Sequence, residues 1–231
     1  MNKTIQITTL ARFCAAFGTL GLQVGSRTDV GKRTQDDTEW YVVRRFLKEG
    51  LLAGVFKPPL SVRKVSPPEP DFVLEGSDGK TMALVEITEA TDPADQREMT
   101  EFERSKQPAM LLGGLGGRFA GGASQPGRVW ASDVLDAVAR KEAKTICSSS
   151  AVERHLVIYP NSNASVLLFD NEGERDAFNY LDEVIAERRD ELLRTVNGCL
   201  VHVLGKEHVC FDLLGKNQLV ERVRRSNLPH P

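Results

Sequence analysis

Hydrophobic and polar positions first settle into a regular pattern near residue 34 of the chain. Apolar residues recur at helical spacing from Trp40 onwards, directly behind the polar run Asp36–Thr38. Cap chemistry followed by this spacing predicts a helix, which Gly50 and Gly54 are expected to end. Residues 1–33 lack a convincing pattern and are rich in glycine, so we expect a loosely attached N-terminal segment there.

A pair of strands is predicted next. Prolines in residues 67–70 exclude a helix and deliver the chain, extended, into Asp71–Leu74. Residues 75–80 are polar and contain two glycines, which is typical of a turn, and Thr81–Thr88 has the composition of a second strand. The two strands are expected to form an antiparallel hairpin.

The rest of the chain alternates between helical and strand patterns. Glu89–Arg128 becomes polar and then glycine-rich, which predicts a long loop that could close over a site. Ser132 is expected to cap a helix that runs to about Ile146. Further strands are predicted at His155–Tyr159, Ser165–Phe169, Cys199–Leu204 and His208–Leu213, with a charged amphipathic helix at Glu174–Arg194. This order predicts an α/β fold, a mixed central sheet flanked by helices, with residues 34–231 as a single domain.

Composition narrows the class of protein. The chain has 231 residues, 41% hydrophobic and 27% charged, which is typical of a globular protein. Its four cysteines show no metal-binding or disulfide spacing, so reduced thiols and a cytoplasmic location are expected. The apolar run from Phe13 to Leu22 is too short to span a bilayer, and we expect no membrane partner. A cleaved export signal remains the alternative for this run.

A net charge of −2 means that the molecule as a whole does not attract nucleic acid strongly. Any such binding would need a local patch, and the stretch from Trp40 to Lys64 has six basic residues against one acidic residue. The basic residues are Arg44, Arg45, Lys48, Lys57, Arg63 and Lys64. The alternative is that several of them only form the solvated face of a helix.

The chemistry that the sequence suggests centres on two carboxylates at the ends of the predicted hairpin. Asp71 opens the first strand and Glu86 lies near the end of the second, so antiparallel pairing brings them to one end of the sheet. Glu86 also interrupts an apolar run, a costly position for a carboxylate unless a cation or hydrogen bonds compensate it. Hard oxygen ligands suit Mg²⁺ or Mn²⁺.

These residues resemble a known family. Pro70-Asp71, Glu86-Ile87-Thr88 fifteen residues later, an upstream helix with Glu39 and a following helix with basic residues resemble the PD-(D/E)XK nuclease superfamily, over roughly Thr34 to Phe169. The resemblance implies a restriction-endonuclease-like sheet and Mg²⁺, with Mn²⁺ as a substitute, bound by Asp71 and Glu86. Glu39 would assist directly or through water. The implied reaction is hydrolysis of phosphodiester bonds in DNA, with RNA as the less favoured substrate. The phosphates would meet five residues of the basic stretch, Arg44, Arg45, Lys48, Arg63 and Lys64.

The sequence departs from that family at Thr88, which stands where the motif has lysine. In some members of the family the lysine migrates to the neighbouring helix, and Lys141 and Lys144 lie three residues apart, on one helical face. Lys141 is the first choice. The alternatives are that both lysines face solvent, and that Glu39 only interacts with the helix dipole.

The runner-up function is a catalytically inactive nucleic-acid-binding or regulatory protein, and a third reading is a structural protein whose carboxylates never meet. The sequence leaves a homodimer open.

Overall fold

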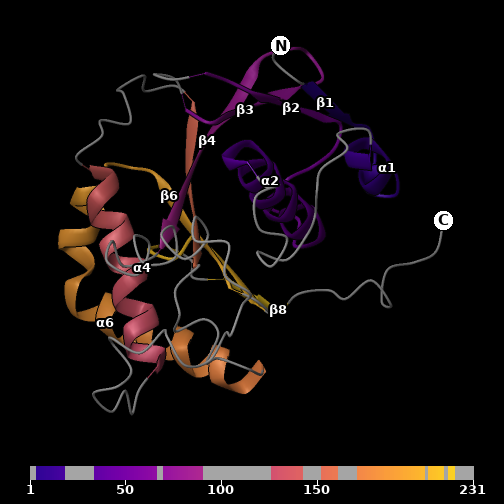
Figure 1. Cartoon of the computed structure of the whole chain (residues 1–231). Helices are drawn as coiled ribbons and strands as arrows, with labels where there is room; N and C mark the ends of the chain where they lie inside the picture. Colours follow the sequence, from indigo (N-terminus) through magenta and orange to yellow (C-terminus); the bar gives the residue numbers. More distant parts are fainter. Residues whose placement is uncertain are drawn as a thin grey trace.

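The computed structural model describes residues 4–18, 34–66, 70–90, 126–142, 152–160, 171–205, 208–215 and 218–221. Within these ranges a mixed sheet of eight strands is accompanied by four helices, which confirms the predicted α/β class (Figure 1). The strands are β1 Thr4–Ile7, β2 Leu60–Lys64, β3 Phe72–Gly76, β4 Thr81–Ala90, β5 Glu153–Pro160, β6 Leu200–Leu204, β7 His208–Phe211 and β8 Gln218–Glu221. The helices are α1 Phe13–Gly18, α2 Gln35–Leu52, α4 Pro126–Glu142 and α6 Asn171–Val196.

The order of the strands in the sheet follows their order in the chain, from β1 to β8. Strands β1 to β4 are antiparallel, β5 joins β4 in parallel, β6 joins β5 in parallel, and β6 to β8 are antiparallel again. Both predicted hairpins, β3–β4 and β6–β7, are confirmed. The parallel pairs are connected through the segments that contain α4 and α6, as parallel strands require a crossover.

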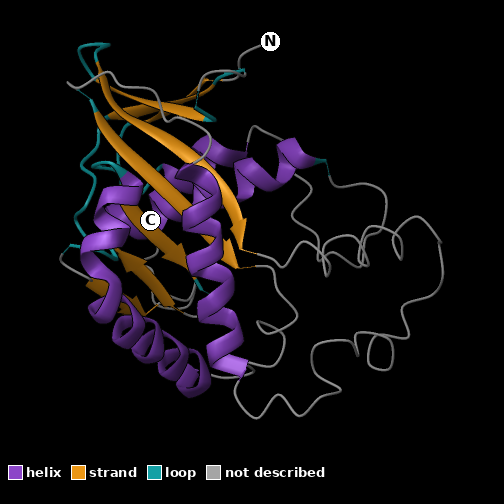
Figure 2. Cartoon of the chain, turned by 90° about the vertical axis from the view of Figure 1, so that its left-hand side faces the viewer, coloured by secondary structure: helices purple, strands orange, loops and turns teal. Residues whose placement is uncertain are grey.

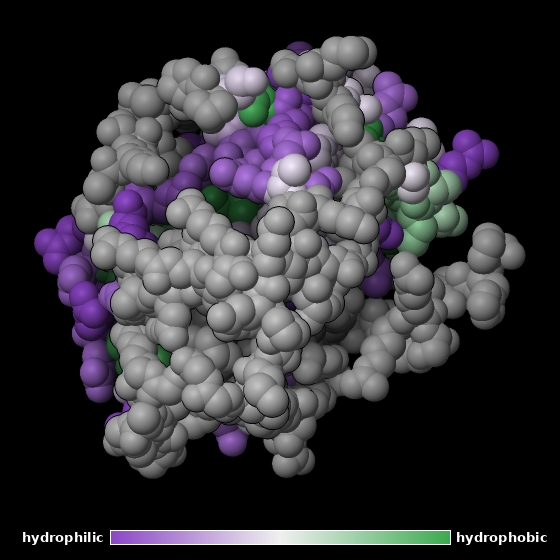
Figure 3. Space-filling view, in the orientation of Figure 1, coloured by the Kyte–Doolittle hydropathy of each residue, from purple (hydrophilic) through white to green (hydrophobic). Residues whose placement is uncertain are grey.

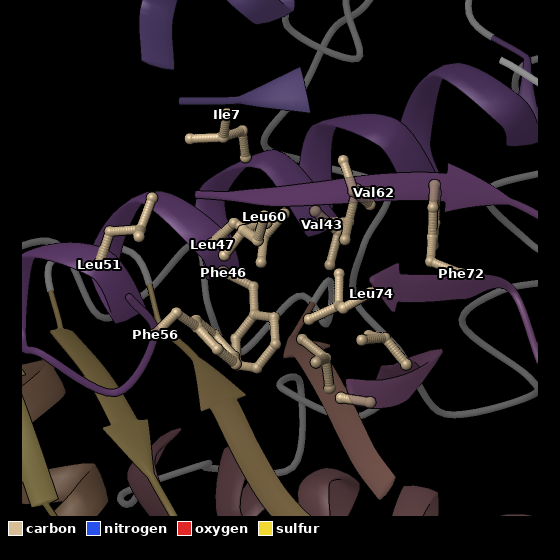
Figure 4. Close-up of a cluster of buried hydrophobic side chains, with 14 of the residues drawn as sticks. Ile7, Val43, Phe46, Leu47, Leu51, Phe56, Leu60, Val62, Phe72 and Leu74 are labelled. Carbon is tan, nitrogen blue, oxygen red and sulfur yellow. The ribbon is translucent and has the colours of Figure 1, made fainter. Parts of the chain in front are cut away.

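Helices cover both faces of the sheet (Figure 2). On one face, Val43, Phe46 and Leu47 of α2 pack against inward-pointing strand residues such as Val62 and Leu74 (Figure 4). On the other face, α4 and α6 pack against alternate residues of β5 and β6. Burial of two such apolar layers is the main driving force for this architecture.

Part of the N-terminal segment differs from the expectation of loose attachment. β1 pairs with β2, placing Ile5 opposite Val62, and it buries both of its isoleucines. Phe13 and Phe17 of α1 are each 1% exposed. The apolar alternation in β1 spans only four residues, too short for the pattern to reveal a strand before its partner is known. Residues 19–33 lie outside the described part of the chain.

The boundaries of two helices also differ. The N-cap of α2 is Thr34, which forms a capping box with Asp37. The helix therefore begins at Gln35, earlier than the cap expected at Asp36–Thr38. Gly50 lies inside α2, whereas Gly54, with φ of +74°, follows its end as expected. α4 begins at Pro126 and not at Ser132, since the fixed φ of proline suits the first helical turn.

One strand was not predicted, and some predicted elements lie outside the described residues. β2 was not predicted because three of its five residues are polar or charged. The predicted strand Ser165–Phe169, most of the predicted loop and the expected helix end at Ile146 lie outside the described residues. None of the helices that the structure describes is long and apolar enough to cross a lipid bilayer.

Candidate active site

The two carboxylates of the predicted site lie on neighbouring strands. Phe72 of β3 pairs with Val85 of β4, and continuing that register places Asp71 opposite Glu86. Phe72 and Val85 both point into the core beneath α2. Because side chains alternate between the faces of a sheet, Asp71 and Glu86 share the other face, which α4 covers. The structure therefore brings together the pair on which the sequence hypothesis depends.

The carboxylate of Asp71 is held by the opposite strand. The backbone amide of Ile87 donates a hydrogen bond of 2.7 Å to Asp71 Oδ2. Burial, followed by the nearby charge of Glu86, raises the pKa of Asp71 from 3.8 to about 6, while the Ile87 hydrogen bond and Lys141 act in the opposite direction. Like charges thus repel across the pair, and a cation between them would relieve that repulsion.

Lys141 is the basic residue that the described structure brings to this pair. It lies in the last turn of α4, and its ammonium group donates a hydrogen bond to Glu86 Oε1. The side chains of Lys141 and Glu86 are 16% and 21% exposed, so solvent screens the contact only in part. Thr88 lies two residues beyond Glu86 on the same strand face and has no charge to offer. Lys144 lies outside the described residues.

Glu39 approaches from α2 but is engaged by other partners. Its Oε1 accepts a hydrogen bond of 2.8 Å from Gln35, and its Oε2 lies 2.6 Å from the ammonium group of Lys64. The charge of Glu39 still acts on Asp71 and contributes to its raised pKa. The charge of Glu39 thus reaches Asp71, while its carboxylate is held by Gln35 of α2 and Lys64 of β2.

The five predicted phosphate contacts do not form one surface. Arg63 lies on the face of β2 opposite to Val62, the face that Asp71 also occupies, and it pairs with Glu75 at 3.0 Å. Lys64 points the other way and binds Asp36 and Glu39. Arg44, Arg45 and Lys48 lie along α2; Arg44 stands over the Phe17 ring at 6.0 Å and Lys48 lies 3.7 Å from Glu49.

Hydrophilic residues occupy much of the described surface in the upper part of the space-filling view and along its left edge (Figure 3). The ion pairs just described join Arg63 and Lys64 of β2 to acidic residues of β3 and α2. Three of the five predicted contacts, Lys48, Arg63 and Lys64, thus have an acidic neighbour, and Arg63 is the member that shares a face with the carboxylate pair.

The two carboxylates suit a hard divalent cation that needs only one or two ligands from the protein. Among the described residues, no group of three or more His, Cys, Asp or Glu side chains is placed to hold a metal ion. Mg²⁺ usually keeps several waters and is bound through one or two carboxylates together with substrate phosphate oxygens. Two opposed carboxylates that repel one another fit that pattern, whereas the described residues do not form a site built wholly from protein ligands.

Sequence reasoning missed two features of the site. The backbone amide of Ile87 orients Asp71, and a backbone donor cannot be recognised from the type of residue. The engagement of Lys64 by Glu39 was hidden because β2 was not predicted, although alternation of Leu60, Val62 and Lys64 on one strand face would have placed Lys64 towards α2.

Comparison of the chain with known proteins adds no relative: no family model, no curated protein and no solved structure matches it.

Proposed function

We propose that the protein is a divalent-metal-dependent nuclease of the PD-(D/E)XK type that hydrolyses phosphodiester bonds in DNA. The observation that carries the proposal is the contact of Lys141 with Glu86, opposite Asp71. An ammonium group at this place supplies the positive charge that Thr88 lacks. Two carboxylates and one lysine then meet on a single sheet face, from three separate segments of the chain.

The order of the elements supports the same proposal. Helix α2 with Glu39 comes first along the chain and is followed by β2. The hairpin β3–β4 with the two carboxylates, helix α4 with Lys141 and strand β5 come after it in that order. This is the order of helix, hairpin, basic helix and strand on which the resemblance rests. The sheet is mixed and has helices on both faces, as that family requires.

In the proposed reaction Asp71 and Glu86 would hold Mg²⁺ or Mn²⁺. A divalent cation so held polarises a phosphoryl oxygen and lowers the pKa of water. Lys141 would place its charge beside the reacting phosphate, where a preorganised positive group stabilises the additional negative charge of the transition state. Arg63, on the same face, would contact a neighbouring phosphate. To do so, the Arg63 side chain would exchange its ion pair with Glu75 for one with the phosphate.

The test incubates the purified protein with plasmid, linear duplex and single-stranded DNA, and with RNA, in Mg²⁺ and in Mn²⁺. Glu86→Gln should abolish cleavage because it removes one of two metal ligands. Glu191→Gln is the matched control, since it neutralises a 57% exposed carboxylate on α6 that pairs with Arg188. Cleavage that survives in Glu86→Gln would point to a contaminant or to another centre and would overturn the proposal.

A second candidate is a nucleic-acid-binding or regulatory protein without catalysis. Thr88, in the position of the motif lysine, favours it, because a threonine hydroxyl supplies no positive charge. Binding of duplex DNA without cleavage in either metal would select this candidate.

A further inference from the structure

Lys64 is committed to two acids of helix α2. Its ammonium group lies 2.6 Å from Glu39 Oε2 and also donates a hydrogen bond to Asp36 Oδ1. Its side chain is only 19% exposed and stands over the Phe72 ring, 5.8 Å from the ring centroid. Partners on two sides and an aromatic ring beneath leave the lysine poorly placed to reach a phosphate.

Glu39, the partner of Lys64, acts electrostatically on Asp71. Lys64 pairs with Phe72 in the register of β2 and β3, and Phe72 directly follows Asp71 in the chain. Glu39, which Lys64 holds, adds to the negative field that Asp71 experiences. Gln35 fixes the other oxygen of the Glu39 carboxylate, so Glu39 has one defined position.

We propose that Lys64 is a positioning residue of the metal site, which holds Glu39 in place and offsets its negative charge beside Asp71, rather than a contact for nucleic acid. The inference rests on the proposed function, because it concerns cation binding by Asp71 and Glu86. It reassigns one of the five residues that the basic stretch suggested as phosphate contacts.

Charge decides the expected effect on cation binding. Removal of the Lys64 charge leaves Asp36 and Glu39 uncompensated, and the field at Asp71 becomes more negative. A unit charge acting through partly solvated protein changes divalent-cation affinity by a few-fold, so Lys64→Met should tighten Mn²⁺ binding by roughly threefold to tenfold. Lys64→Arg keeps the charge and can bridge both acids, and its affinity should stay within about twofold of the wild type.

Two measurements on the full chain test the inference. Mn²⁺ binding without nucleic acid is followed by electron paramagnetic resonance for the wild type, Lys64→Met and Lys64→Arg. Lys80→Met is the matched control, because Lys80 is 84% exposed in the turn at the far end of the β3–β4 hairpin. Binding of a labelled duplex in Ca²⁺ is then measured by fluorescence anisotropy across a salt series, with Arg63→Met for comparison.

The expected result is tighter Mn²⁺ binding in Lys64→Met alone, with the salt dependence of duplex binding unchanged. A phosphate contact would behave in the opposite way: its loss would reduce the slope of log affinity against log salt by about 0.9, as expected for Arg63→Met. Unchanged Mn²⁺ affinity in Lys64→Met, or a reduced slope, overturns the inference. Two results overturn the proposed function and the inference with it: the wild-type protein binds no Mn²⁺, or the Glu86→Gln variant binds Mn²⁺ as tightly as the wild type.

Discussion

The amide of Ile87 and the carboxylate of Asp71 join two strands at the site through a hydrogen bond of 2.7 Å. The residue next to Glu86 thereby orients the carboxylate that faces Glu86. Formation of the hairpin and orientation of the metal ligands are thus one event, because a single strand supplies both a ligand and the donor that fixes the other ligand.

Asp71→Asn separates orientation from charge. The amide oxygen of asparagine can still accept the Ile87 hydrogen bond, so we expect the midpoint of thermal unfolding to change little. Loss of a charged ligand should lower the cleavage rate by about a hundredfold or more, the range seen when a group that stabilises the transition state is removed. Asp71→Ala, which also loses the hydrogen bond, should be the less stable protein, and equal activity of Asp71→Asn and wild type would contradict the assignment.

Lys141→Met should divide binding from catalysis. Without the ammonium group, Glu86 keeps its full charge for a cation, so Mn²⁺ affinity should be unchanged or higher. The cleavage rate at saturating metal should fall by about a hundredfold, because the positive charge beside the phosphate is gone. Lys144→Met is the informative comparison: a loss of rate in that variant and none in Lys141→Met would move the catalytic role to Lys144.

A buried histidine pair predicts how stability depends on pH. The amide of Asp212 donates to His202 Nδ1 at 3.3 Å, so His202 Nε2 has the proton and donates to His155 Nδ1 at 2.8 Å. Both rings are therefore neutral, and the Nε2–H group of His155 is buried without an aligned hydrogen-bond acceptor among the described residues. Burial lowers the pKa of His155 from 6.5 to about 4, and burial followed by the neighbouring His155 lowers the pKa of His202 well below 6.5. Glu153 lies 2.9 Å from His155 Nε2 without hydrogen-bond alignment and is 57% exposed, so burial decides the direction.

The sign follows from which state binds the proton. Between pH 6.5 and 4 the unfolded chain protonates its histidines while the folded pair stays neutral, so the contribution of this pair to the free energy of unfolding falls as the pH falls through this range. His155 alone should account for about 3 kcal/mol across it. Urea unfolding of the wild type and of His155→Gln at pH 7 and pH 4.5 measures the effect. A wild-type pH dependence equal to that of the variant would show that the pair does not have these protonation states.

Gly50→Ala reverses the usual effect of that substitution in a helix. Alanine normally stabilises a helix interior by about 1 kcal/mol over glycine. At Gly50, however, a Cβ atom would lie 2.5 Å from the Phe56 ring, which packs against Phe46 in the core. We expect a net loss of about 1 to 3 kcal/mol in thermal or urea unfolding. Gly18→Ala, where no atom of the described residues lies within 4 Å of the added atom, should show no such loss.

The elements that could be predicted from the sequence have a long hydrophobic pattern, or have proline and glycine residues at their ends. The β3–β4 hairpin was predictable because prolines and a glycine-containing turn flank two apolar runs, and Asp71 and Glu86 then came together through antiparallel pairing alone. Helix α2 was predictable from its spacing, although its cap is Thr34. The reach of Lys141 to Glu86 could be only a hypothesis, since the packing of α4 on β4 is tertiary.

Short elements and paired charges escaped prediction for a common physical reason. β1 has four residues and β2 has five, and each is stabilised by its neighbour rather than by its own composition. Arg63 and Lys64 stand side by side in the sequence but face opposite sides of the sheet, so a count of local charge could not distinguish them. Partner identity decides their roles, and partners come only with the fold.

The succession of the strands, each beside its neighbour in the chain, bears on how the molecule is made. During synthesis every strand after the first finds its partner already outside the ribosome, on the edge most recently added. The sheet can therefore grow in one direction as translation proceeds, because no strand after the first has to wait for a partner made later, although β1 and β2, and β4 and β5, are brought together across long connections. The carboxylate pair belongs to strands made early, whereas the lysine that approaches it arrives only once α4 has docked.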